Sequence, residues 1–152
     1  MKNKATQKKF KFKSPFVTVD AIIELKEGVV VIERLNPPYG WALPGGFVEY
    51  GESLEAAVKR EAKEETNLTL TKICQLHTYS DPKRDPRFHT VGTVFIAHGK
   101  GKPKSGDDAR TLRVVAFDDL LKVNFVFDHK KIIRDYLKIR GLPAGRQGGR
   151  LT

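Results

Sequence analysis

The sequence predicts an α/β (α+β) fold in which a mixed β-sheet is covered by few helices. Strand-like tracts outnumber helical ones along the 152 residues, and most connections are too short for repeated crossover helices. With 39% apolar residues the chain can bury the core of one domain. We therefore expect one domain over residues 14–140, flanked by a basic segment (1–13) and a Gly/Arg-rich tail (141–152), both disordered.

β-branched and aromatic residues concentrate in tracts that we expect to be strands. The first two, 16–25 and 29–35, are separated by a short turn with Gly28, which is typical of a hairpin. Two consecutive prolines in segment 36–40 remove ladder donors, so this segment is predicted to be a loop. The remaining strand tracts are 41–46, 69–79, 89–98 and 112–117.

Two segments have the apolar spacing of helices, 53–66 and 128–139. Asp128 is the expected N-cap of the second helix, which ends before a glycine and a proline. Asn67 follows the first helix, at a position where a residue in the left-handed conformation commonly forms the cap. The helices therefore number far fewer than the strands.

The single cysteine, Cys74, excludes an internal disulfide and suits a reducing compartment. Because Ile73 and Leu76 lie beside it, we expect a buried structural thiol. The basic N-terminus lacks the apolar run of a signal peptide, and no segment approaches the ~20 apolar residues of a membrane helix. The sequence thus predicts a cytoplasmic protein without a membrane-spanning segment.

The net charge of +10 is carried by the two ends of the chain. Residues 1–13 contain six lysines and residues 138–152 four basic side chains, whereas residues 14–137 hold 18 basic and 18 acidic side chains. A neutral body with basic ends is more typical of a soluble domain than of a nucleic-acid reader. Weak, salt-sensitive contact of the ends with nucleic acid or a membrane surface stays open.

Two carboxylates lie on the apolar side of the first predicted helix. At ~100° per residue, Glu61 and Glu65 are one turn apart and share the direction of Leu54, Ala57 and Val58. Two buried like charges are costly unless a cation lies between them, and a hard divalent cation satisfies carboxylate oxygens. An isolated Arg-Glu-x-x-Glu-Glu run would more often be a solvated helix face.

This run is part of a longer pattern that resembles the Nudix box, G-x5-E-x7-R-E-U-x-E-E-x-G-U with U apolar. Its specified positions are filled by Gly46, Glu52, Arg60, Glu61, Ala62, Glu64, Glu65 and Leu68. Asn67 replaces the second Gly, and Asn is the next best residue for that conformation. The chain therefore resembles Nudix hydrolases over most of residues 14–138, which implies an α/β/α sandwich with a mixed central sheet.

The resemblance implies a role for each residue of the pattern. Mg²⁺, with Mn²⁺ as a substitute, is the implied cofactor. The implied metal ligands are the carbonyl of Gly45 and the carboxylates of Glu61, Glu64 and Glu65. Arg60 and Glu52 would pair and orient these ligands, unless they form only an ordinary surface ion pair.

The base that activates water is not fixed by the sequence. Relatives with the Gly-Asp-Asp-Ala element, here 106–109, tend to carry Glu two residues later, where this chain has Thr111. No Glu follows Glu65. The base is therefore a Glu of the pattern, or Asp107 or Asp108 from the loop, unless the metal alone activates the water.

The substrate class depends on a second segment, 79–91, which is similar to the S-D-P-x-R-D-P-R-x-H-x-V segment of the ADP-ribose pyrophosphatase branch. Its arginines Arg84 and Arg87 can bind phosphate or ribose bidentately. Phe88 stands where that branch usually has Gly, and the run 125–129 is also similar to the branch. The implied substrate-binding residues are Trp41, Gly46, Arg84, Arg87, Asp107 and Asp108.

The resemblance implies a homodimeric, Mg²⁺-dependent hydrolase that cleaves ADP-ribose, or a close nucleoside-diphosphate derivative, into AMP and a sugar phosphate. Two alternatives stay open. One is a pyrophosphatase of oxidised dNTPs that releases inorganic pyrophosphate. The other is a non-catalytic sensor of nucleotide sugars, which Thr111 and the basic ends favour.

Overall fold

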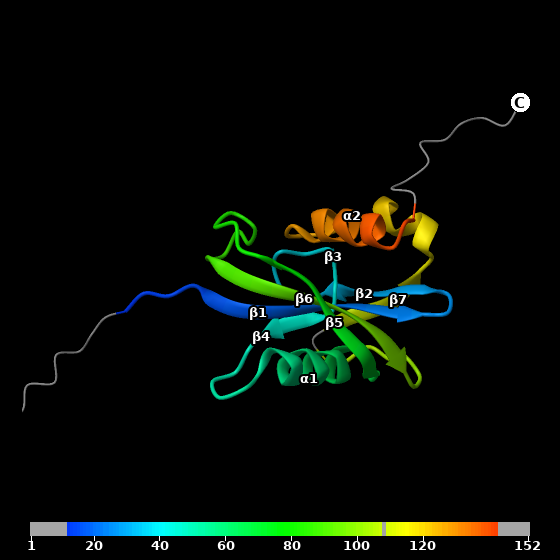
Figure 1. Ribbon diagram of the computed structural model, residues 1–152, viewed down its shortest axis with the longest axis horizontal. Coiled ribbons are helices and arrows are strands. Elements are labelled where there is room, and N and C mark those ends of the chain that lie inside the picture. Colours follow the sequence, from blue (N-terminus) through cyan, green and yellow to red (C-terminus); the bar gives the residue numbers. More distant parts are fainter. Residues whose placement is uncertain (1–11, 108, 143–152) are drawn as a thin grey trace, which may run out of the picture.

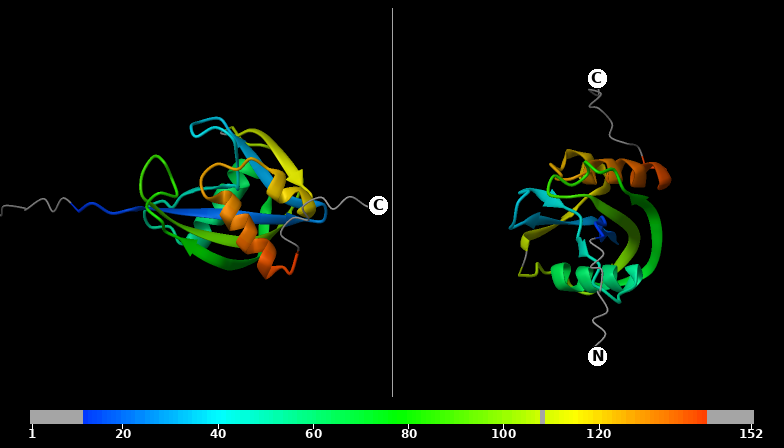
Figure 2. Two further views of the ribbon diagram at one scale, coloured as in Figure 1. Left: turned by 90° about the horizontal axis from the view of Figure 1, so that it is seen from above. Right: turned by 90° about the vertical axis from the view of Figure 1, so that its left-hand side faces the viewer.

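The computed structural model describes residues 12–107 and 109–142 (Figure 1). One mixed sheet lies between two helical layers. Helix α1 (Leu54–Thr66) covers one face, whereas α2 (His129–Ile139) and the short 3₁₀ helix η1 (Phe117–Lys122) cover the other (Figures 1 and 2). The predicted α/β/α sandwich with a mixed sheet is thus confirmed. Most of the segments predicted to be disordered, 1–13 and 141–152, lie outside the described residues.

Seven strands form the sheet. They are β1 (Phe16–Leu25), β2 (Gly28–Arg34), β3 (Trp41–Ala42), β4 (Gly45–Phe47), β5 (Thr69–Tyr79), β6 (Thr90–Lys100) and β7 (Ala109–Val115). Their order is β3-β2-β1-β6-β5, with β4 paired to β1 and β7 to β2. Only β1 and β6 are parallel; the other pairs of the described sheet are antiparallel.

Strands β1 and β2 part soon after their hairpin. Their pairing is confined to the two residue pairs beside the turn. Further along, β1 pairs with β4 instead, where Asp20 lies opposite Gly45. The separation of β1 from β2 leaves room for the pocket described below.

Two apolar clusters fix the helices on the sheet. Between the sheet and α1 the buried side chains include Ala57, Val58 and Ala62. The cluster under α2 contains Ile132 and Ile133, together with other side chains of that helix. These residues recur at helical spacing, so the amphipathic patterns predicted from the sequence are the faces that are buried.

Both ends of α1 follow the sequence prediction. The Ser53 hydroxyl accepts a hydrogen bond from the N–H of Ala56 (3.1 Å), which is the usual N-cap contact. Asn67 ends the helix with φ 61°, and its N–H donates to the Lys63 carbonyl. Asn thus fills the position where the Nudix pattern has Gly, and α1 is held in place as a rigid support for its carboxylates.

Two strand predictions need correction. The tract 112–117 forms a strand that begins earlier, at Ala109, and ends at Val115. Phe117 instead opens η1, because its side chain packs with the cluster under α2. The tract 41–46 forms two short strands, β3 and β4, separated at Pro44, which has no N–H to donate to a ladder.

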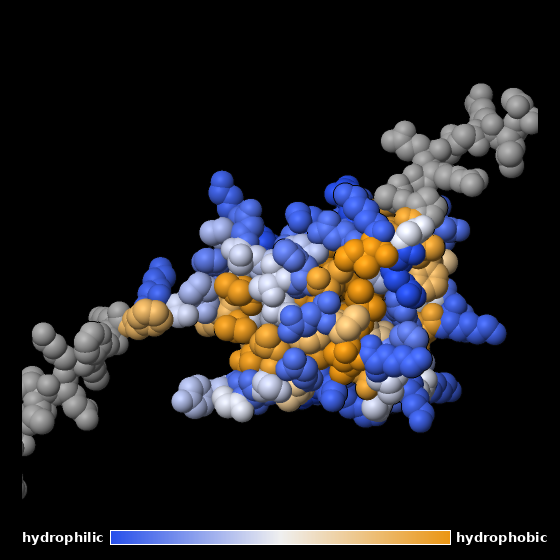
Figure 3. Space-filling model, viewed as in Figure 1, coloured by the Kyte–Doolittle hydropathy of each residue, from blue (hydrophilic) through white to orange (hydrophobic). Residues whose placement is uncertain are grey.

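Cys74 is exposed, so the predicted burial of this thiol was wrong. Strand β5 is a sheet edge, and its register with β6 shifts on both sides of this residue. Each shift changes which side chains face the helices, so Ile73 and Leu76 pack against the two clusters while Cys74 meets solvent. Figure 3 shows apolar surface on this side of the molecule, between the two helical layers.

Asp128 occupies the predicted N-cap position of α2, but its carboxylate makes no capping hydrogen bond. Both of its oxygens accept from Arg84 instead. A charged bidentate partner outcompetes a backbone N–H for the same carboxylate. Among the described helices, none is long and apolar enough to cross a membrane.

Candidate active site

A cavity of about 330 Å³ opens where β1 and β2 separate. Its wall is formed by β1, β2, β4, one face of α1, the loop between β5 and β6, and the segment before α2. Charged residues of both signs line it: Asp20, Arg34, Glu49, Glu61, Glu65, Arg84, Asp85 and Arg87. We call this cavity the main pocket.

Glu65 lies at the inner wall of the main pocket. Its Oε2 accepts a hydrogen bond from the Gly45 N–H (2.8 Å), which joins α1 to β4. Burial raises the pKa of Glu65 to about 8; the Gly45 N–H opposes this shift and the nearby charge of Glu61 adds to it. Among the described residues, the nearby positive charge of Arg34 does not offset the cost of burying the ionised carboxylate.

Glu61 lies one turn earlier on the same face of α1, with its side chain 14% exposed. The missing side chain of Gly46 makes room for it, because a Cβ there would overlap the Glu61 carboxylate. Burial raises the pKa of Glu61, although hydrogen bonding and charge from Arg60 oppose the shift. The expectation that both carboxylates lie on the inward side of the helix is confirmed.

Arg60 connects the acidic residues of the motif. Its Nε and Nη2 donate to the two oxygens of Glu52 at 2.8 and 3.0 Å. Its Nη1 donates to Glu61 at 2.8 Å and to Glu64 at 3.3 Å. Hydrogen bonding to Arg60 also lowers the pKa of Glu52. The expected pairing of Arg60 and Glu52 is present, and Arg60 also orients Glu61 and Glu64. We call Glu61, Glu64 and Glu65 the carboxylate group.

A smaller cavity of about 250 Å³ adjoins the carboxylate group and is also lined by Asp107. The loop that carries Asp107 is fixed on the end of α1, since the N–H of Gly106 donates to the Glu65 carbonyl (3.0 Å). A Cβ on Gly106 would overlap the backbone of Glu64. The structure therefore brings Asp107 to the motif, whereas Asp108 lies outside the described residues.

The buried carboxyl group of Asp20 on β1 also lines the main pocket, and the sequence analysis missed it. His129 Nδ1 accepts from the N–H of Leu43 (3.0 Å), so Nε2 carries the ring proton and faces Asp20 at 3.6 Å. Burial lowers the pKa of His129 to about 3, so the ring is neutral. Burial raises the pKa of Asp20 to about 7, with Arg84 opposing. The only sequence signal was its acidic side chain inside a mostly apolar strand, which also contains Glu24.

Comparison with known proteins agrees with this geometry. The NUDIX domain family matches residues 14–136. The chain belongs to the NUDIX family. An ADP-ribose pyrophosphatase of Methanocaldococcus jannaschii is 46% identical over 127 residues, which are 82% of this chain and 74% of that protein. The family, the motif and this relative together make the chain a Nudix pyrophosphohydrolase.

Two solved NUDIX structures superpose with a TM-score of 0.76. One is a bifunctional NMN adenylyltransferase/ADP ribose pyrophosphatase of Francisella tularensis with AMP and a Mn ion, 29% identical; the match covers 85% of this chain and 43% of that one. The other is the NUDIX domain of Shewanella oneidensis NrtR with ADP ribose, 28% identical, covering 85% of this chain and 90% of that one.

Nudix hydrolases use divalent cations, and the residues present fit one. The carboxylate group supplies oxygen ligands, and the raised pKa values of Glu61 and Glu65 indicate a deficit of positive charge. Within residues 12–107 and 109–142 no three acidic or histidine side chains already converge on one point. Arg60 donates to Oε1 of Glu61 and the Gly45 N–H donates to Oε2 of Glu65, so these two contacts orient the carboxylates toward a cation.

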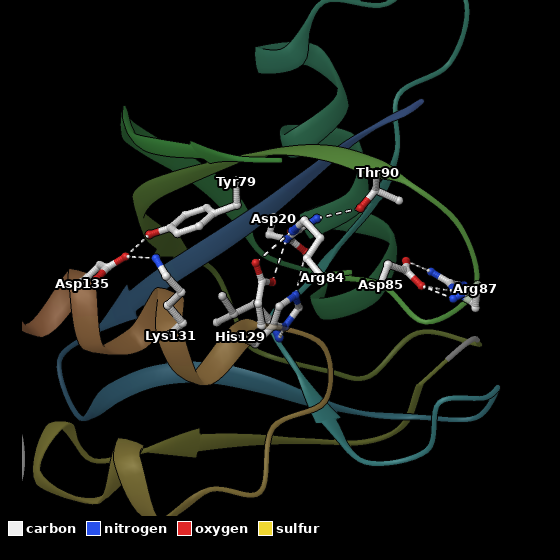
Figure 4. A network of polar contacts seen from close by, with 11 residues as sticks. Asp20, Tyr79, Arg84, Asp85, Arg87, Thr90, His129, Lys131 and Asp135 are labelled. Atoms are coloured by element: carbon white, nitrogen blue, oxygen red, sulfur yellow. Dashed lines mark hydrogen bonds and ion pairs between the residues drawn. The ribbon is translucent and has the colours of Figure 1, made fainter. Parts of the chain in front are cut away.

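Arg84 lines the main pocket, but its guanidinium is already bonded to neighbouring side chains. It is buried, and its Nε and Nη2 each donate to Asp128 at 2.9 Å while Nη1 donates to Thr90 at 2.9 Å. In Figure 4 it lies at the centre of a polar network, beside Asp20 and Thr90. Its donors are engaged within the Nudix domain, and they fix the loop between β5 and β6 to the start of α2.

Arg87 belongs to the same loop and is more open to the main pocket, with its side chain 33% exposed. Its Nε and Nη2 donate to Asp85 at 3.0 and 2.9 Å (Figure 4). Burial raises the pKa of Asp85, but the hydrogen bonds from Arg87 outweigh this and lower it. The Arg87 guanidinium also stacks on Phe88, 4.9 Å from the ring centre.

Trp41 lies outside the main pocket. It lines a separate cavity of about 300 Å³, and the Arg113 guanidinium lies 4.8 Å from its ring centre. Its neighbour Ala42 faces the main pocket, as the alternation of side chains along a strand requires. Of the other residues expected to bind substrate, Gly46, Arg84 and Arg87 do line the main pocket.

Proposed function

We propose that this Nudix hydrolase cleaves the diphosphate bond of ADP-ribose, or of a close nucleoside-diphosphate derivative, to AMP and a sugar phosphate with Mg²⁺ as cofactor. The observation that carries the proposal is the inward-facing pair Glu61 and Glu65 in a pocket that also contains arginines. The names of the similar proteins support this substrate, since one is an ADP-ribose pyrophosphatase and another was solved with ADP ribose.

Different residues are proposed to bind the metal, to orient its ligands and to accept the proton of water. A divalent cation on Glu61, Glu65 and the Gly45 carbonyl would neutralise phosphoryl oxygens and acidify the attacking water. Arg60 keeps the carboxylate group oriented through its bonds to Glu61 and Glu64. Asp107 and Glu64 line one cavity with Glu61 and Glu65, which supports either of them as the group that accepts the proton of water.

One product analysis tests the proposed function. The protein is incubated with ADP-ribose, with dNTPs and with dinucleotides, each with and without Mg²⁺, and the products are identified. We expect AMP and ribose phosphate from ADP-ribose only when Mg²⁺ is present. Release of pyrophosphate from dNTPs without turnover of ADP-ribose would favour the nucleotide-sanitising alternative, and tight binding without turnover would favour the sensor.

The homodimer implied by the family resemblance and the cytoplasmic location expected from the single cysteine stay predictions. Light scattering on the purified full chain measures the first directly. A mass of two chains is the expected result, and a monomer that is fully active would remove dimerisation from the proposal.

A further inference from the structure

Phe127 borders the main pocket in a backbone conformation that is rare for an aromatic residue, with φ 56°. The chain around it is fixed. The N–H of Val126 donates to the Trp41 carbonyl (2.9 Å), and the N–H of Trp41 donates to the Asn124 carbonyl (3.4 Å). Strain of this kind persists only where surrounding structure enforces it, and it clusters at ligand sites. The Phe127 ring is therefore held beside the pocket at a cost in backbone energy.

Two guanidinium groups lie against this ring. The Cζ atoms of Arg34 and Arg87 are 5.0 and 5.3 Å from its centre, so they are at most about 10 Å apart. We call Arg34 and Arg87 the arginine pair. Burial lowers the pKa of Arg34 and the charge of Arg87 lowers it further, although the charges of Glu65, Asp85 and Asp20 oppose the shift. Two cationic side chains thus contact the same ring, Phe127, in a pocket that is also lined by Glu65.

The two members of the arginine pair differ in how their charge is balanced. Arg87 has Asp85 as a bidentate partner. Arg34 donates from Nε to the Pro38 carbonyl (2.9 Å) and from Nη2 to the Pro37 carbonyl (3.4 Å), both neutral acceptors. These bonds fix the direction of the Arg34 guanidinium, and none of the ion pairs formed by the described residues includes it, so the carboxylates that act on its charge do so from beyond contact distance.

The main pocket therefore has two unmet electrostatic needs. The carboxylate group has too little positive charge beside it, and Arg34 has no carboxylate in ion-pair contact among the described residues. A single ligand meets both if it is the complex of a divalent cation with a diphosphate, because its metal faces carboxylates while its outer oxygens remain free to accept hydrogen bonds. Free phosphate or free metal alone would meet only one of them.

We propose that Arg34 binds a phosphoryl oxygen of the diphosphate substrate, and that Phe127 and Arg87 form the surface against which the adjoining sugar packs. The inference rests on the proposed function for the identity of the ligand and adds the residues that select it. Arg34 comes from the end of β2, outside the motif and outside the loop that carries Arg87. It acts by binding, so its contribution should be present in the ground state as well as the transition state.

The chain offers a matched control for Arg34. Arg113 also stacks on an aromatic ring, Trp41, at 4.8 Å, but in the cavity outside the main pocket. Arg34→Gln and Arg113→Gln therefore remove the same charge and the same type of ring contact at two places. Arg34→Lys keeps the charge but not the planar fork, and should recover part of the loss.

Steady-state kinetics with ADP-ribose and saturating Mg²⁺ tests the inference. For Arg34→Gln we expect KM to rise about tenfold or more with kcat within about threefold, and for Arg113→Gln no change beyond about twofold. Arg34→Lys should fall between wild type and Arg34→Gln. An unchanged KM in Arg34→Gln, or a fall in kcat with KM unchanged, would overturn the role of Arg34 in binding.

The failure of this inference and the failure of the proposed function give different results. If the wild type cleaves another nucleotide but not ADP-ribose, the proposed function fails, and the same KM comparison on that nucleotide decides the role of Arg34. If the wild type cleaves none, calorimetric titration of ADP-ribose with Mg²⁺ decides it: weaker binding by Arg34→Gln than by Arg113→Gln supports the role. Absence of binding to the wild type overturns both.

Discussion

Two members of the carboxylate group, Glu61 and Glu65, line the same pocket as the arginine pair, but the two groups are assembled in different ways. All members of the carboxylate group come from consecutive turns of α1, so the geometry of one helix sets their spacing. The arginine pair comes from the end of β2 and from the loop between β5 and β6, and its shared neighbour Phe127 precedes α2. A local motif therefore encodes the cation-binding chemistry, whereas the substrate contacts depend on the whole fold.

The two groups also depend on different supports. Arg60 orients the carboxylate group from within the motif. The arginine pair is oriented by Asp85, by the carbonyls of the loop after β2, and indirectly by Arg84, which ties the loop between β5 and β6 to α2. Changes in one support should thus affect metal use, and changes in the other should affect substrate affinity.

The largest expected effect is at the carboxylate group. Glu65→Gln removes a metal ligand, so turnover should fall by about a thousandfold or more while the fold is kept. Product formation from ADP-ribose in Mg²⁺ measures it. Glu55→Gln is the control, because Glu55 is exposed on the same helix. More than about a tenth of wild-type activity in Glu65→Gln would contradict the assigned role.

Loss of Arg84 should have the next largest effect, this time on stability. Arg84→Met leaves the Asp128 carboxylate without its bidentate partner, and breaking a buried ion pair costs about 3–5 kcal/mol of unfolding free energy. Urea denaturation measures this cost. Lys131→Gln breaks the more exposed pair with Asp135 and should cost less than about 1 kcal/mol. Equal effects of the two variants would show that Arg84 does not anchor the loop.

A variant of Arg60 tests whether metal binding and substrate binding depend on different residues. Arg60→Gln frees Glu61 and Glu64 from their orienting donor, so the Mg²⁺ concentration for half-maximal activity should rise about 10- to 100-fold. Arg34→Gln should leave that concentration unchanged, although it raises KM for the nucleotide. If both variants shift the Mg²⁺ requirement equally, the pocket does not divide into a metal part and a substrate part.

The smallest expected effect is a pH dependence of the metal-free protein. The folded-state pKa values of Glu65 and Asp20 are raised to about 8 and about 7, above their unfolded values. The folded state therefore holds protons that the unfolded state has lost, and stability falls as the pH rises from about 5 to 8. The decline should be on the order of 1–2 kcal/mol, since counter-ions screen the open pocket.

Urea denaturation in EDTA at several pH values measures this decline. Addition of Mg²⁺ should restore stability most at the high-pH end, where Glu65 is ionised, and Glu65→Gln should flatten the profile. A metal-free protein that becomes more stable between pH 5 and 8 would contradict the raised pKa values.

Most of the fold could be predicted because local patterns specify it. The limits of β1 and β5 follow from β-branched runs between turn residues, and those of α1 from its cap and its apolar spacing. The errors occurred where tertiary packing decides. Phe117 is not in the predicted strand, because it packs in the cluster under α2. Cys74 is exposed, because the register of the edge strand β5 shifts on both sides of it.

The candidate site could be predicted to the extent that it lies in one helix. The inward direction of Glu61 and Glu65 follows from helical spacing, and the roles of Glu64 and Arg60 follow from the resemblance to the Nudix box. Asp20 and Arg34 could not be found in this way, because each lies in a mostly apolar strand outside the motif and only the sheet brings it to the pocket. For Arg84 the sequence predicted a ligand contact from the residue type. The structure shows that this buried side chain donates to both oxygens of Asp128.

The central claim is that Glu61 and Glu65 face inward because they bind a divalent cation. Anomalous diffraction from crystals soaked in Mn²⁺ tests it most directly. The account predicts a peak at about 2.0–2.3 Å from oxygens of both side chains, and its loss in Glu65→Gln. A fully occupied Mn²⁺ site elsewhere, with no density between these two carboxylates, would contradict the account.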